Sequence, residues 1–314
     1  MKHKNTAYVP LLMLVVYALL ALSQMLLGAV QDVSSNAFLS VSIVQFLVLL
    51  LPLAFYCGLN RLSFVSAVSL KLPKWRDVPF CLYVAMAFLF GSATLKYLTC
   101  AFFGRAAAAT SSLLTVSLYT SNTPLVILCF IFLPAILEQF LFSGLVLSEY
   151  HRYGDVCAVL MSGVMFAMAH FSFENFGFFL FYGLALALCT RVTGSILPAI
   201  LIAAGSFALD LYFEDLFFDY ITQTGTSALL FYFFCGLFLL FSVFAVAHLE
   251  KSYGKRARSA KESARAALEA AHRRTHGDEP GEELSFVAAL RLCFLSPVFI
   301  LLIALFVLMA SGVL

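Results

Sequence analysis

The chain has 314 residues, of which 62% are hydrophobic and only 11% are charged, and its mean hydropathy is +0.98. Soluble domains carry about 25% charged residues, so this composition excludes a soluble globular protein and indicates an all-α polytopic membrane protein in contact with membrane lipid. The net charge of +2 does not indicate nucleic-acid binding, because the basic residues fall between apolar segments and show no aromatic stacking pattern.

Nine apolar runs are candidates for membrane-spanning helices, because about 20 apolar residues cross a bilayer. The fifth to seventh runs are shorter and are separated by tight polar breaks, so we expect them to pack closely inside the protein. Residues 105–123 fit either a short re-entrant helix or a surface helix. The runs cover residues 8–29, 38–59, 80–104, 125–147, 156–170, 176–189, 196–211, 228–248 and 286–308.

The basic residues predict the orientation of these helices. With a cytoplasmic N-terminus, every Lys and Arg except Lys96 and Arg105 falls on the cytoplasmic side, as the positive-inside rule requires. Lys96 lies inside the third run, where we expect its side chain to extend to the nearby interface. Residues 255–274 are rich in Ala, Lys, Arg and Glu and predict a basic helix, which either lies near anionic lipid or is solvated.

These features divide the chain into five parts. We expect N-terminal transmembrane helices in residues 1–124, a helical core in 125–211, the eighth transmembrane helix in 212–249, a cytoplasmic basic helix in 250–285 and the C-terminal transmembrane helix in 286–314. The eight cysteines lie singly in apolar segments without a Cys-x-x-Cys pair, so they are expected to be buried apolar side chains.

Two ionisable residues interrupt the apolar core. Glu138 lies in the fourth run, one turn after Pro134, which should loosen or kink the helix, and His170 ends the fifth run. An ionisable side chain at bilayer depth is costly, so each indicates a functional site. A carboxylate and an imidazole could activate water by general base catalysis or around a metal ion. A hydrogen bond between helices is the structural alternative.

Three motifs resemble the core of the CPBP intramembrane proteases, which include type II CAAX prenyl endopeptidases and bacterial bacteriocin-processing and immunity proteins. They are Glu-Gln-Phe-Leu-Phe-Ser-Gly at 138–144, Phe166-x-x-x-His170, and Gly-Ser-Ile-Leu-Pro-Ala-Ile at 194–200. The family pattern is Glu-Glu-x-x-x-Arg, then Phe-x-x-x-His, then His-x-x-x-Asn. The resemblance covers residues 125–211 and implies that Glu138 is the catalytic base and that His170 assists it.

Four family positions are replaced in this chain. Gln139 stands for the second Glu and Ser143 for the Arg, a pair of changes that removes both partners of a plausible buried ion pair. Ala203 and Phe207 stand where the second His and the Asn are expected, and neither can hold water or stabilise an oxyanion.

Ser206 and Asp210 repeat the four-residue spacing three positions later and could supply polar groups to a shifted site. Alternatively, Asp210 begins an acidic outer interface that continues to Asp219.

The resemblance supports three hypotheses about function. The first is an intramembrane endopeptidase with impaired activity, acting on a membrane-embedded or prenylated peptide or protein. The second is a non-catalytic relative that serves as a membrane scaffold, immunity factor or regulator, and the third is a proton-coupled transporter that uses Glu138 and His170.

The cofactor and the location follow from the same resemblance. For a divalent metal such as zinc, the only candidate ligands are His170 and Glu138, fewer than the three protein ligands usual for catalytic zinc. A non-catalytic relative requires no metal. The expected location is the bacterial plasma membrane.

Overall fold

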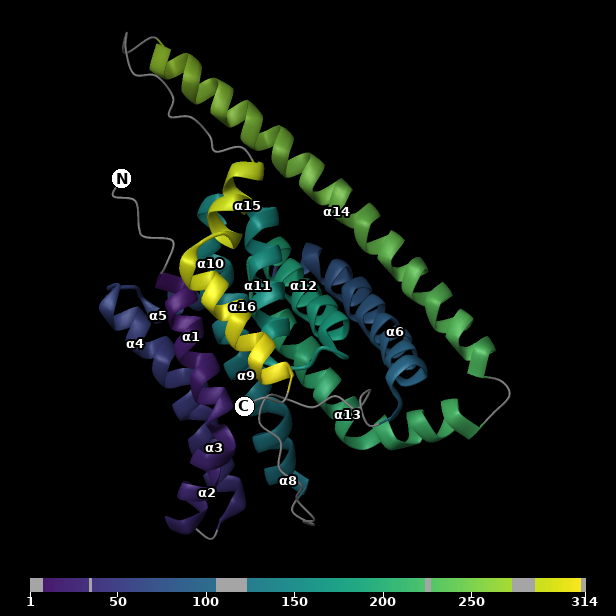
Figure 1. Ribbon diagram of the computed structural model, residues 1–314. Coiled ribbons are helices and arrows are strands. Elements are labelled where there is room, and N and C mark those ends of the chain that lie inside the picture. Colours follow the sequence, from purple (N-terminus) through teal and green to yellow (C-terminus); the bar gives the residue numbers. More distant parts are fainter. Residues whose placement is uncertain (1–7, 34–35, 106–122, 224–226, 273–285, 312–314) are drawn as a thin grey trace.

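The computed structural model describes residues 8–33, 36–105, 123–223, 227–272 and 286–311 (Figure 1). Within these ranges all regular secondary structure is helical, which confirms the predicted all-α class. The ambiguous segment 105–123 falls outside the described residues except at its two ends.

Six helical segments are long and apolar enough to cross a membrane, and three shorter apolar helices accompany them in the described part of the chain. Each of the nine overlaps one predicted apolar run, which confirms a polytopic membrane protein. The long segments are Phe38–Leu59, Trp75–Phe103, Thr123–Tyr153, Phe176–Thr193, Leu197–Thr222 and Ala228–Lys251, and the shorter ones are Tyr8–Ala21, Asp155–Ala169 and Pro297–Ala310.

The helices before the core form two groups in Figure 1, with α1 to α5 on one side of the molecule and α6 on the other. The predicted first run is divided, because α1 ends at Ala21 and α2 begins at Ser23. The bounds are α1 (Tyr8–Ala21), α2 (Ser23–Val33), α3 (Ala37–Gln45), η1 (Phe46–Leu50), α4 (Leu51–Leu59), α5 (Phe64–Val68), η2 (Trp75–Asp77) and α6 (Val78–Phe103).

The core and the C-terminal helices follow. Helices α9 to α12 lie at the centre, α1 packs on α16, and α6 packs on α14 (Figure 1). The bounds are α8 (Thr123–Val126), η3 (Ile127–Phe132), α9 (Leu133–Gln139), η4 (Phe140–Val146), α10 (Leu147–Tyr150), η5 (His151–Tyr153), α11 (Asp155–Ala169), α12 (Phe176–Thr193), α13 (Leu197–Gln223), α14 (Ser227–His272), α15 (Phe286–Phe294) and α16 (Pro297–Ala310).

Two helices run further than the sequence predicts. Helix α13 continues past its predicted end at Leu211 to Gln223, because the carboxylates beyond that point pair with Lys96 of α6 and with Arg105 just after it instead of forming a solvated loop. Helix α14 has 46 residues and therefore measures about 69 Å. The predicted basic helix thus starts as a direct continuation of the eighth transmembrane helix.

One polar contact joins the N-terminal helix to the centre of the core. The Tyr17 hydroxyl, which is fully buried, donates a hydrogen bond to the Met165 carbonyl of α11 at 2.5 Å. Replacing Tyr17 by Phe keeps the ring and leaves that carbonyl without this donor. We expect a loss of about 1 kcal/mol in the free energy of unfolding in detergent, whereas an unchanged value would show that the contact adds no stability.

Candidate active site

Glu138 lies on a transmembrane segment whose backbone is unusual on both sides of it. The short helix α9 carries Glu138 and is flanked by the π-helical stretches η3 and η4. Pro134 lacks the N–H that would bond to the Phe130 carbonyl, so the helix cannot keep regular hydrogen bonding there. This agrees with the expectation that Pro134 loosens the helix. Because π-helical turns are frequent at functional sites, the backbone conformation also indicates that this segment belongs to a functional site.

The three polar side chains of the first motif are buried together. Glu138 and Gln139 are fully buried, and Ser143 is 2% exposed. The Ser143 hydroxyl donates a hydrogen bond to Gln139 Oε1 at 2.6 Å. The two residues that replace the family's Glu and Arg therefore contact each other as a neutral pair. Gln139 Nε2 has no hydrogen-bond partner among the described residues.

His170 caps the C-terminus of α11 and is held by aromatic rings. Its ring stacks on Phe179 with centroids 3.5 Å apart and lies 4.7 Å from the ring of Phe166. Its Nδ1 lies 3.0 Å from the Phe166 carbonyl. Because a carbonyl can only accept, Nδ1 carries the proton and Nε2 presents its lone pair. The ring orientation is thus fixed by the Phe-x-x-x-His spacing, which places the two side chains on one face.

An aromatic cluster surrounds His170. The ring of Phe166 stacks on Tyr182 at 5.0 Å and meets Phe142 edge-on at 5.1 Å, while its other neighbour is His170. These rings come from η4, α11 and α12, so the cluster joins three segments of the core around His170.

Tyr182 also covers the positions where the family carries its second His and its Asn. Ala203 is fully buried and Phe207 is 7% exposed, and both belong to the main hydrophobic core. The Tyr182 hydroxyl reaches the Ala203 carbonyl at 3.5 Å, and its ring stacks on Phe207 at 6.3 Å. Sequence reasoning missed Tyr182, whose signal is a tyrosine directly before Gly183 in the apolar first part of the helix.

The third motif shapes the turn between α12 and α13. Gly194 ends α12 with φ of 66°, a left-handed conformation that glycine adopts without a steric penalty. Ser195 then donates a hydrogen bond to the Lys71 carbonyl and accepts one from the Leu197 N–H at 3.2 Å. These residues position the start of α13 and contribute no catalytic group.

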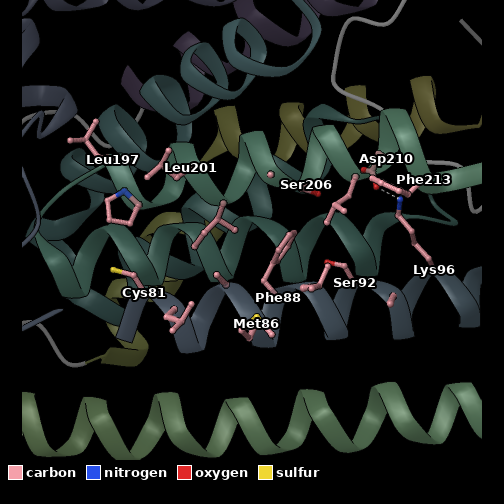
Figure 2. A pocket seen from close by; sticks show the side chains of 18 of the residues that line it. Cys81, Met86, Phe88, Ser92, Lys96, Leu197, Leu201, Ser206, Asp210 and Phe213 are labelled. Atoms are coloured by element: carbon pink, nitrogen blue, oxygen red, sulfur yellow. Dashed lines mark hydrogen bonds and ion pairs between the residues drawn. The ribbon is translucent and has the colours of Figure 1, made fainter. Parts of the chain in front are cut away.

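Ser206 and Asp210 lie about one turn beyond Ala203 and Phe207 on the same face of α13, at its edge. Both line a groove between α6 and α13 (Figure 2), where Asp210 Oδ1 pairs with Lys96 Nζ at 2.5 Å. Glu214 pairs with the same ammonium at 2.8 Å, and Lys96 is 7% exposed. Two carboxylates of α13 therefore hold the Lys96 ammonium, and the prediction that this side chain extends to the nearby interface stays a prediction.

The described residues contain no group of three or more His, Cys, Asp or Glu side chains that could hold a metal ion. The residues present thus do not fit a catalytic zinc site with three protein ligands. The chemistry available to this site rests on one carboxylate and one imidazole, both on membrane-embedded helices. Such a site defines a class of protein, a polytopic helical membrane protein with a buried acid and base.

Comparison with known families narrows that class. Residues 120–208 match the family model described as type II CAAX prenyl endopeptidase Rce1-like. The match includes Glu138, His170, Ala203 and Phe207, and it confirms the resemblance to CPBP intramembrane proteases. No curated protein and no solved structure matches the chain.

Proposed function

We propose that the protein is a membrane-embedded relative of the type II CAAX prenyl endopeptidases in which peptide-bond hydrolysis is impaired. The observation that supports this most strongly is the contact of Tyr182 with Ala203 and Phe207. An aromatic side chain and two apolar residues occupy the region where the resemblance places a His and an Asn. The family match itself supports the substrate class, a membrane-embedded or prenylated peptide.

The retained residues have defined parts in this proposal. The Glu138 carboxylate accepts a proton from water as the water attacks the peptide carbonyl, and His170 Nε2 orients that water through its lone pair. The tetrahedral intermediate then carries an oxyanion that needs hydrogen-bond donors. Removing one such donor costs about 10²–10³-fold in rate, and α13 offers neither expected side chain.

The test is hydrolysis of a farnesylated, quenched-fluorescent peptide by protein reconstituted in phosphatidylcholine vesicles. We expect turnover at least about 10²-fold below the typical enzyme value of about 10 s⁻¹, because the oxyanion donors are missing. Glu138→Gln should remove the remaining turnover, since Gln cannot accept the proton. Glu174→Gln, at an exposed loop carboxylate, is the matched control and should leave it unchanged.

Two results would contradict the proposal. Turnover near 10 s⁻¹ would show that the site is not impaired, and measurable turnover unaffected by Glu138→Gln would exclude Glu138 as the base. Binding of the same peptide without any turnover, equal in the wild type and the Glu138→Gln variant, would favour the non-catalytic scaffold, immunity or regulatory role. The neutral Gln139 and Ser143 pair is the observation that favours this second candidate.

We also propose that the N-terminus is cytoplasmic. Helix α6 starts just after Lys71, Lys74 and Arg76, which would then lie in the cytoplasm. The acidic end of α13 would lie on the opposite side of the membrane. The positive-inside rule supports this orientation.

A further inference from the structure

A long apolar groove lies between α6 and α13, apart from the buried Glu138 site. Its volume is about 770 Å³, and its lining follows one helical stripe on each helix. Figure 2 shows these side chains strung along both helices from Cys81 and Leu197 at one end to Lys96 and Asp210 at the other. The exposed apolar residues Leu82 and Leu201, which are 59% and 67% exposed, belong to this lining.

The other faces of the two helices are already covered by protein. Helix α6 packs on α14 through ring pairs such as Phe90 with Phe241 at 5.9 Å and Tyr83 with Phe244 at 5.6 Å. In Figure 2, α14 lies on the opposite side of α6 from the groove. Ala203 and Phe207 of α13 are buried in the core. The groove lies between two membrane-spanning segments, where the surrounding solvent is lipid.

The length of the groove indicates that its ligand is an extended apolar chain. From Val78 to Lys96 the α6 backbone rises about 27 Å, close to the hydrocarbon thickness of a bilayer of about 30 Å. One acyl chain of a membrane lipid matches the length and the apolar lining of this groove.

The charged side chains at one end of the groove determine which lipid headgroup can bind there. Lys96 is paired with Asp210 and Glu214, and Arg105 is paired with Asp215 and Asp219 just beyond the end of α6. The Asp219 and Asp215 hydrogen bonds raise the pKa of Arg105 further, so it stays charged. Four carboxylates against two cations leave this end negative. A free fatty acid or an anionic headgroup would be repelled, whereas an ammonium group would be attracted.

Ser92 adds a polar contact inside the groove. Its side chain is 9% exposed, and its hydroxyl has no hydrogen-bond partner among the described residues. It lines the groove one helical turn before Lys96, about 6 Å deeper along the helix axis (Figure 2). In a glycerophospholipid the ester carbonyls lie below the headgroup, so an ester carbonyl can accept the hydrogen bond that Ser92 offers.

We propose that this groove binds one molecule of phosphatidylethanolamine. One acyl chain fills the space between α6 and α13, Ser92 donates to the ester carbonyl, and the headgroup ammonium meets the carboxylates around Lys96. The proposal does not depend on hydrolytic activity at Glu138.

Spin-labelled lipids in phosphatidylcholine vesicles that contain the full-length protein test the site. We expect an immobilised signal from labelled phosphatidylethanolamine that exceeds the signal from labelled phosphatidylglycerol. Gly205→Phe should abolish the excess, because Gly205 lines the groove and a Cβ there meets no atom within 4 Å, so a large side chain can be placed in the groove. Gly236→Phe is the matched control on α14, where the glycine is equally open but outside the groove.

The headgroup contact has its own test. Replacing Asp210 by Asn and Glu214 by Gln should remove the preference for the ethanolamine lipid while size-exclusion elution stays unchanged. If these variants do not fold, the comparison of Gly205→Phe with Gly236→Phe still decides whether the chain binds in the groove. Equal immobilisation of both lipids by the wild type, or an excess that persists in Gly205→Phe, would overturn the proposal.

Discussion

Replacing Lys96 by Met is expected to lower the free energy of unfolding by about 3 kcal/mol, one of the two largest stability effects foreseen for this protein. The Lys96 ammonium is 7% exposed and lies within 2.8 Å of carboxylate oxygens of both Asp210 and Glu214. Removing it leaves two carboxylates close together in a largely buried place with no compensating charge. Unfolding in mixed micelles by titration with dodecyl sulfate measures the change.

Two further variants separate charge from packing. Lys74→Met, at an exposed lysine before α6, should change stability by less than about 0.5 kcal/mol. Replacing Lys96 by Met together with Asp210→Leu and Glu214→Leu should recover most of the loss, because apolar residues can replace a buried ion cluster at little cost. A Lys96→Met protein as stable as the wild type would show that the cluster contributes nothing.

Replacing Gly183 by Val is expected to force α11 and α12 apart and to cost about 3 kcal/mol. A Cβ at Gly183 would lie 2.9 Å from the Gly163 Cα and 3.1 Å from the Gly163 carbonyl oxygen. Both are backbone atoms, which cannot rotate away as a side chain can. Because Phe166 Cβ is also 2.9 Å away, the change should displace the ring that contacts His170 and Tyr182.

Gly177→Val is the matched control for this prediction. Gly177 lies in the same helix, and a Cβ there meets no atom within 4 Å. It should therefore cost no more than the small difference in helix propensity, below about 1 kcal/mol. Thermal unfolding in detergent distinguishes the two variants. Similar midpoints for Gly183→Val and Gly177→Val would show that the close helix contact is not needed for stability.

Much of the architecture could be predicted because lipid imposes a simple rule. Every backbone polar group in the bilayer must be satisfied internally, so long apolar runs can only be helices, and all nine predicted runs overlap helical segments among the described residues. The effect of Pro134 was also foreseeable, since the missing N–H is a local property. The end of α13 was not, because its carboxylates read as a loop when their partners Lys96 and Arg105 are unknown.

The roles of the polar residues depended on information that is not local. The pattern of motifs identified Glu138 and His170, and the family match over residues 120–208 agrees with it. Their catalytic roles stay predictions. The spacing of Ser206 and Asp210 suggested a shifted site, whereas in the structure Asp210 pairs with Lys96, 114 positions away in the chain. No periodicity in α13 alone could reveal that partner.

The sequence by itself determined the class of protein, the approximate course of its helices and the two ionisable residues at its centre. Hydropathy, the effect of a proline and the spacing of a motif depend on residues that are close together in the sequence, so they can be predicted from the sequence directly. Only the tertiary structure decided that Tyr182 covers Ala203 and Phe207, that Gln139 and Ser143 pair with each other, and that α6 and α13 enclose a groove. Except for the pair one turn apart on the same segment, these contacts join different helices, and packing brings such helices together.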